Sequence, residues 1–212
     1  MGRLLLCLGL LAVLSACGSG RPVASVITIE HDRYTDPSPP SLTLVTSIRT
    51  AAGSGAHSAI IINASQRVIF DPAGSFEATS EGKVAGPQRG DVIYGVSPEV
   101  LAAYLKFQSS TGYHVVTLSI PVPAAVAEEA LVKAEDHGWV SQAFCADASS
   151  QMLASLPGFE KVHVTLFPRA LMRQVEKLPG VTMRTLVDGR EVPNGSAWQL
   201  SGGKGSTPLS DF

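Results

Sequence analysis

Residues 55–70 of the chain read GAHSAIIINASQRVIF, and this stretch decides the fold. A run of small and β-branched apolar residues opens around His57 and is followed by a polar segment at 63–66. A second apolar run then ends at Phe70. Two strand-forming runs joined by a short polar segment are typical of an antiparallel β-hairpin. Pro72 ends the second strand, because proline cannot donate to a β-ladder.

Further strands and helices are predicted around this hairpin. Alternating and β-branched stretches predict strands at 23–29, 42–48, 113–121, 162–167 and 181–187. Helical patterns predict helices at 97–108, 123–137, about 141–155 and 168–178. Ser97-Pro98 is a clear helix start, since serine caps a helix and proline fits its first position. Helices and strands of this kind around one core predict an α+β fold with an antiparallel sheet packed against helices.

The N-terminus has the features of an exported lipoprotein. Arg3 precedes an apolar run at 4–14, which is shorter than the roughly 20 residues that a membrane-spanning helix needs. The next residues, Leu14-Ser15-Ala16-Cys17, resemble the lipobox of bacterial lipoproteins. That resemblance implies cleavage before Cys17 and acylation of this cysteine. An ordinary cleaved signal peptide is the alternative.

This interpretation predicts four parts of the chain. They are a signal peptide at 1–16, a lipidated N-terminus and tether at 17–40, one domain at 41–198 and a disordered Gly- and Ser-rich tail at 199–212. Two or three acyl chains give lasting membrane attachment, so the membrane is an expected partner. Gly18 after the cysteine, in place of aspartate, indicates the periplasmic face of the outer membrane under the sorting rule of such lipoproteins.

The charge balance argues against a nucleic-acid ligand. The chain has 16 Lys and Arg against 18 Asp and Glu, so loss of Arg3 leaves 15 against 18 and a net charge of −3. The sequence has no run of basic residues that would suit a phosphate backbone. The histidines and acidic residues also lack the spacing of metal ligands, so we expect neither a metal nor another cofactor.

The cysteine count draws attention to one thiol. Of the three cysteines, Cys7 leaves with the signal peptide and Cys17 carries the lipid. Cys145 is then the single free thiol of the mature chain, and it has no partner for an intramolecular disulfide. A lone cysteine of this kind is either an inert core residue or a functional thiol.

The position of Cys145 favours a functional thiol. A helix that begins near Ser141 puts this cysteine in its first turn, where backbone N–H groups and the helix dipole stabilise a thiolate. The same N–H groups can hold an oxyanion. The nearby Trp139 and Phe144 either line a cleft beside the thiol or belong to the core.

His57 and Asp71 are the candidate partners of this thiol. A thiolate nucleophile needs a base, and His57 opens a strand directly after a glycine-rich loop, where a side chain can face a cleft. A histidine that merely sits at a strand end is the alternative. Asp71 follows His57 by fourteen residues, an even offset that lets both side chains share a face of a regular hairpin. An Asx-type turn before Pro72 is the other interpretation of Asp71.

The segment 55–62, followed later by a cysteine at a helix start, resembles the permuted papain-like branch of the NlpC-type superfamily. This branch includes bacterial envelope lipoproteins and the lecithin–retinol acyltransferases. The usual order places the cysteine helix before the histidine hairpin, whereas here His57 precedes Cys145 by 88 residues. The resemblance covers roughly Ser41 to Phe167 and implies a circularly permuted, papain-like fold.

The resemblance also implies acyl transfer, with Cys145 as nucleophile, His57 as base and Asp71 as the polar third residue. We therefore expect a lipid-anchored thiol hydrolase or acyltransferase of the envelope that acts on an amide or ester bond of cell-wall peptide, or of a lipid. The alternative is a non-catalytic envelope lipoprotein that uses the same fold for binding or assembly. The oligomeric state stays open.

Overall fold

The computed structural model describes residues 23–74, 76, 86–141 and 143–196. The predicted signal peptide, the predicted lipid-bearing Cys17 and the predicted tail at 199–212 lie outside these residues. Within them, no helix is both long enough and apolar enough to cross a membrane.

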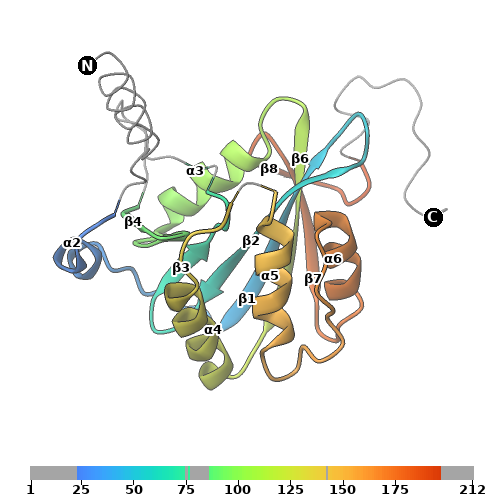
Figure 1. Cartoon of the computed structure of the whole chain (residues 1–212). Coiled ribbons are helices and arrows are strands. Elements are labelled where there is room, and N and C mark those ends of the chain that lie inside the picture. Colours follow the sequence, from blue (N-terminus) through green and yellow to red (C-terminus); the bar gives the residue numbers. More distant parts are fainter. Residues whose placement is uncertain (1–22, 75, 77–85, 142, 197–212) are drawn as a thin grey trace, which may run out of the picture.

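One antiparallel sheet organises the described residues (Figure 1). Its eight strands run in the order β4-β5-β3-β2-β1-β6-β7-β8. The strands are β1 (Ser41–Arg49), β2 (Gly55–Asn63), β3 (Arg67–Phe70), β4 (Gln88–Arg89), β5 (Val92–Ile93), β6 (Tyr113–Pro121), β7 (Thr182–Val187) and β8 (Arg190–Val192). The predicted hairpin is confirmed as β2 and β3, which pair in regular register from Ile60–Phe70 to Asn63–Arg67.

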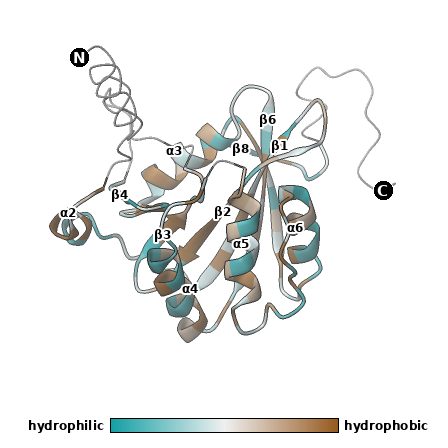
Figure 2. Cartoon of the chain, viewed as in Figure 1, coloured by the Kyte–Doolittle hydropathy of each residue, from teal (hydrophilic) through white to brown (hydrophobic). Residues whose placement is uncertain are grey.

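Helices cover both faces of the sheet, which confirms the α+β class with an antiparallel sheet. The described helices are α2 (Val26–His31), α3 (Pro98–Gln108), α4 (Ala124–Asp136), α5 (Cys145–Ala154) and α6 (Pro168–Val175). A larger core joins α4, α5 and α6 to one sheet face, and a smaller core joins α3 to the other. In Figure 2 the apolar residues gather on the central strands, while polar residues occupy the outer sides of α4 to α6.

Local sequence signals set most of these boundaries. Ser97 accepts a hydrogen bond from the backbone N–H of Val100 and Pro98 opens α3, as the sequence predicts. Strands β1 and β6 also match their predicted ranges to within one residue. The third predicted helix begins later than expected, at Cys145 rather than near Ser141.

Two predicted strands are wrong. Residues 23–29 do not form a strand, because Ser25 caps the backbone N–H of Thr28 and starts helix α2. Residues 162–167 form no ladder either, since side chains satisfy their backbone: Gln174 accepts from the N–H of His163, and Ser150 accepts from the N–H of Thr165. Three short strands, β4, β5 and β8, were not expected from the sequence.

The segment predicted as a tether makes contacts with the domain where it is described. Ile29 of α2 belongs to the larger core. Further along, the backbone N–H of Arg67 donates to the carbonyl of Tyr34, and the Arg67 guanidinium forms a hydrogen-bonded ion pair with Asp36. Residues 29–36 are therefore attached to the domain.

Candidate active site

His57 lies near the start of β2, beside an irregularity in the sheet. Ser47 pairs with His57 but the next residue of β1, Ile48, pairs with Gly55, so Ala56 has no partner on β1. An extra residue of this kind is a β-bulge, which turns a strand and re-aims its side chains. Only 13 % of the His57 side chain is exposed.

Asp71 reaches His57 because of the hairpin register. Continued by one residue, the β2–β3 register puts Asp71 opposite Ala59, so His57 is its diagonal neighbour on the same face. The His57 imidazole donates through Nε2 to Oδ1 of Asp71. Asp71 also begins a turn, but through its backbone carbonyl, which accepts from the N–H of Gly74 at 2.9 Å. The side chain is therefore engaged by His57 rather than by an Asx-type turn.

Tyr104 of α3 is a third member of this network that the sequence did not reveal. Its hydroxyl donates to the same oxygen, Oδ1 of Asp71, at 3.1 Å, and the residue is fully buried. Burial, followed by the charge of Asp71, raises the pKa of Tyr104 well above its ordinary value, so the hydroxyl stays protonated as a donor. Tyr104 follows Val100 at the spacing of a buried helix face, so the sequence pattern presents it as an ordinary core residue.

Cys145 is the first residue of α5, and 6 % of it is exposed. Burial alone would raise the pKa of its thiol. The hydrogen bond and positive charge of His57, with backbone hydrogen bonds at Ser58 and Ala146, outweigh that effect and hold the pKa of the thiol below its ordinary value. The helix dipole of α5 favours the thiolate as well.

The pKa of His57 changes in the opposite direction. Burial lowers it, but the charge and hydrogen bond of Asp71, joined by those of Cys145, raise the pKa from 6.5 to about 10. A lowered thiol pKa and a raised imidazole pKa together favour a thiolate–imidazolium pair. Because Nε2 of His57 is engaged by Asp71, Nδ1 is the ring nitrogen left for the thiol.

Asp91 connects the loop after β3, which contains Asp71, to the loop before α5, which contains Val140. Its carbonyl accepts from the backbone N–H of Asp71, and its carboxylate accepts from the N–H of Val140 at 2.8 Å. Close to Val140, Ala143 adopts a φ of 81°, which is strained for a residue with a side chain. Strained backbone is frequent at functional sites, where the surrounding structure holds it in place.

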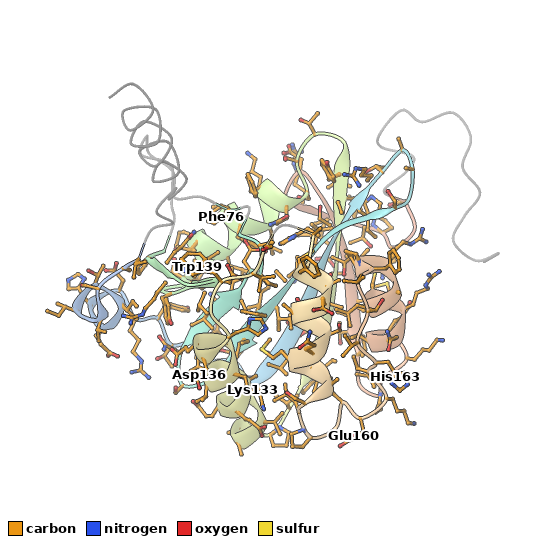
Figure 3. All side chains as sticks on the ribbon, in the orientation of Figure 1. Phe76, Lys133, Asp136, Trp139, Glu160 and His163 are labelled. Atoms are coloured by element: carbon orange, nitrogen blue, oxygen red, sulfur yellow. The ribbon has the colours of Figure 1, made fainter. Side chains whose placement is uncertain are left out.

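The remaining histidines do not join the site. His31 and His163 are exposed, and Figure 3 shows His163 at the periphery of the molecule. His114 is buried and hydrogen bonded to Thr50, and burial followed by the charge of Arg169 lowers its pKa. His137, at the end of α4, packs against Phe70 with the two rings tilted by 57°.

The structure thus brings together the three residues that the sequence analysis proposed as catalytic, Cys145, His57 and Asp71. Trp139 and Phe144 are 45 % and 46 % exposed, so neither belongs to the core. Among the described residues, no group of three or more His, Cys, Asp or Glu could hold a metal ion.

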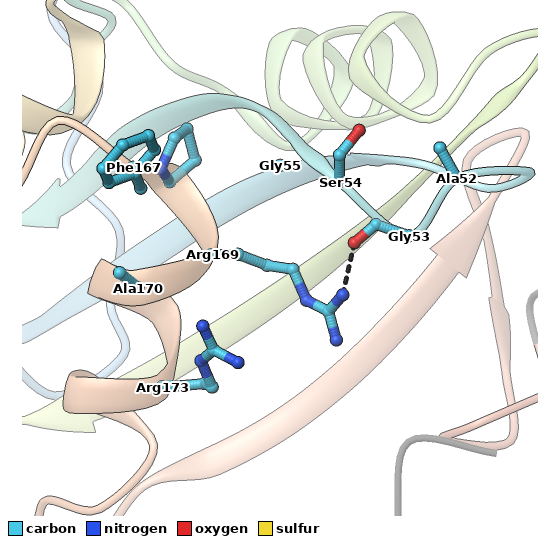
Figure 4. Close-up of a pocket in the computed structure, with 9 residues that line it drawn as sticks. Ala52, Gly53, Ser54, Gly55, Phe167, Arg169, Ala170 and Arg173 are labelled. Atoms are coloured by element: carbon cyan, nitrogen blue, oxygen red, sulfur yellow. Dashed lines mark hydrogen bonds between the residues drawn. The ribbon is translucent and has the colours of Figure 1, made fainter. Parts of the chain in front are cut away.

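A pocket opens between α6 and the turn that joins β1 to β2 (Figure 4). Its volume is about 440 Å³, and Phe167, Arg169 and Arg173 supply its larger side chains. The guanidinium of Arg169 donates to the carbonyl of Gly53 across the pocket. No sequence pattern indicates this pocket, because its two walls are separated by more than a hundred residues.

In comparisons with protein-family models, curated proteins and solved structures, no match to the chain was found in any of the three.

Proposed function

We propose that this chain is a thiol hydrolase or acyltransferase that acts on an amide or ester bond through Cys145 and His57. The observation that carries the proposal is the position of His57 between two acidic groups, the Asp71 carboxylate on Nε2 and the Cys145 thiol. A nucleophile, a base and a residue that orients the base are the parts that acyl transfer requires.

The first half of the reaction forms a thioester. The Cys145 thiolate attacks the carbonyl carbon, a C–S bond forms, and the carbonyl electron pair moves onto oxygen. Backbone N–H groups at the start of α5 stabilise that oxyanion. The His57 imidazolium then donates its proton to the leaving nitrogen or oxygen as the bond to the acyl carbon breaks.

The second half releases the acyl group. Neutral His57 takes a proton from water, or from the hydroxyl or amine of an acceptor, and the resulting nucleophile attacks the thioester carbon. The C–S bond breaks and its electron pair returns to sulfur, which restores the thiolate beside an imidazolium. Asp71 stabilises the imidazolium in both halves and fixes the ring orientation.

The resemblance of residues 41–167 to the permuted papain-like branch supports this chemistry and a circularly permuted, papain-like arrangement of the fold. The resemblance of residues 14–17 to a lipobox supports an anchor at Cys17 and a location in the envelope, on the periplasmic face of the outer membrane. Together they favour cell-wall peptide as the substrate.

A labelling experiment with matched variants tests the proposal. The full chain is treated with an alkyne-bearing chloroacetamide, and labelling of Cys145 is compared among the wild type, His57→Ala and His114→Ala. His114 is the matched control, since it is also buried but bonds Thr50 instead of Asp71. We expect His57→Ala alone to slow labelling, and equal rates in all three proteins would contradict the proposal.

Product analysis then identifies the substrate. The wild type and Cys145→Ser are incubated with peptidoglycan fragments and, separately, with phospholipid vesicles. Peptide products that depend on Cys145 would support cell-wall peptide, whereas released fatty acid would assign a lipid ester.

One observation favours a second candidate function, a binding or assembly module without catalysis. Cys145 is only 6 % exposed, so a substrate carbonyl has little access to the thiol in this conformation. In that case Cys145→Ser would change the products from neither peptidoglycan fragments nor phospholipid vesicles. The variant would still bind one of these two envelope materials.

A further inference from the structure

We propose that the pocket beside α6 binds an anionic group of the substrate, a carboxylate or a phosphate, through Arg169 and Arg173. This inference rests on the proposed function for its link to the thiol. The charge, geometry and position of the pocket support it.

The pocket is positively charged and lacks a counterion of its own. Arg169 and Arg173 lie one turn apart on α6, so their guanidinium groups share one side of the helix. None of the residues that line the pocket is acidic. Among the described residues, the Arg173 side chain has no hydrogen bond or ion pair, and the Arg169 side chain is bonded to the Gly53 carbonyl but to no carboxylate. Two guanidinium groups without an acidic partner are the arrangement that carboxylates and phosphates bind.

The wall opposite α6 holds one arginine in position. Gly53, with a φ of 62°, presents its carbonyl to the Arg169 guanidinium, as the dashed line in Figure 4 marks. Gly55 allows the close approach of α6, since a Cβ there would lie 2.8 Å from the backbone nitrogen of Arg169 and 2.9 Å from the Cβ of Pro168. The glycines of this turn therefore keep the two walls close and pre-organise the guanidinium.

The position of the pocket connects it to the thiol. The start of α6 meets strand β2 at Gly55, and α5 packs against the same strand, where the Ser58 backbone helps to lower the pKa of the Cys145 thiol. Three residues of regular strand span about 10 Å, and the bulge at Ala56 shortens the strand, so Gly55 and Ser58 lie within that distance of each other. In Figure 1 helices α5 and α6 lie side by side over the sheet. A substrate whose reacting carbonyl lies at Cys145 can thus extend past the exposed Phe167 and place an anionic group in the pocket.

A series of esters tests the distance from the thiol to the arginines and the charge preference of the pocket together. The probes are 4-nitrophenyl monoesters of succinic, adipic, suberic and sebacic acid, each compared with its methyl-capped diester. We expect kcat/KM to favour the free acid about tenfold or more at suberate and sebacate, and not at succinate, whose chain is too short to reach the arginines. Tenfold corresponds to about 1.4 kcal/mol, which is reasonable for one charge-assisted hydrogen bond.

The variant Arg173→Gln should abolish the preference for the longer acids. Its matched control is Lys177→Gln, which removes the same charge just beyond the end of α6 but outside the pocket, and which should keep the preference. Hydrolysis that depends on Cys145 but shows no acid preference at any chain length would overturn this inference and leave the proposed function standing.

A binding measurement separates the pocket from catalysis. Inorganic phosphate and, separately, acetate are titrated into ¹⁵N-labelled protein while the amide resonances of Gly53 and Gly55 are followed. Chemical-shift changes that disappear in Arg173→Gln would support anion binding in the pocket. This holds even if ester hydrolysis proves independent of Cys145 and the proposed enzymatic function fails. The anion that binds more tightly would identify the group that the pocket recognises. Unchanged resonances with both anions would overturn the inference.

Discussion

Asp71, one residue beyond the end of β3, is the diagonal neighbour of His57 on β2, and the Nε2 of the imidazole is hydrogen bonded to Oδ1 of the carboxylate. The regular register of the hairpin and the bulge at Ala56 aim the two side chains at each other. Tyr104 of α3 donates to the same carboxylate oxygen. The carboxylate that orients the proposed base is therefore itself held by a residue that is distant in the sequence.

The reactivity of Cys145 with iodoacetamide should already be high below the pH at which free thiols ionise. The thiol pKa is lowered, so the thiolate forms as the pH rises through a value below the reference of about 8.5. In His57→Ala burial dominates and the thiol pKa rises, so alkylation at pH 7 should slow by about tenfold or more. The check is the alkylation rate from pH 5 to 10, with His114→Ala as control. A wild-type profile centred at 8.5 would contradict the ion pair.

The His57–Asp71 ion pair should contribute to stability over a defined pH range. The folded-state pKa of His57 is about 10, against 6.5 for a free imidazole. Its stabilisation is therefore fully present below pH 6.5 and is lost as the pH rises through about 10. Urea unfolding from pH 6 to 10 measures this effect, and Asp71→Asn should remove that part of the pH dependence. Asp188→Asn, on an exposed turn, is the control and should not.

The substitution Tyr104→Phe should reduce turnover more than substrate binding. It removes one donor from the Asp71 carboxylate while keeping the ring, which leaves the imidazolium less well oriented. We expect kcat to fall about tenfold with little change in KM, and the protein to lose about 1.5–3 kcal/mol of stability, the range for a hydrogen bond to a charged group. Tyr94→Phe is the matched control, since Tyr94 is buried but bonds Glu135. Equal losses of kcat in both variants would mean that Tyr104 has only a packing role.

The substitution Gly55→Ala should destabilise the start of α6. The added Cβ would collide with the backbone nitrogen of Arg169 and with Pro168. We expect a loss of about 1–3 kcal/mol, the usual cost of overpacking. Ser54→Ala, at the exposed neighbouring position, should be close to neutral. Unfolding midpoints in urea check both, and equal midpoints for Gly55→Ala and the wild type would show that α6 moves without cost.

The sequence predicts local structure well where a short-range signal decides it. The helix start at Ser97, the hairpin turn at 63–66 and the strand at 113–121 each follow from capping, turn or alternation patterns of neighbouring residues. The wrong strand at 162–167 shows the limit of this approach. Its alternation is real, but the side chains of Gln174 and Ser150 satisfy its backbone in place of a neighbouring strand.

For the candidate site, the sequence by itself identified Cys145 as the free thiol, His57 as its candidate base and the even offset from His57 to Asp71. These follow from a residue count, from the position of a helix start and from the period of two along a strand. Only the tertiary structure decided that α5 begins beside His57, that Tyr104 donates to Asp71, and that two arginines of α6 face the β1–β2 turn. These contacts join segments far apart in the chain, and they form because apolar helix faces are buried against both sides of one sheet.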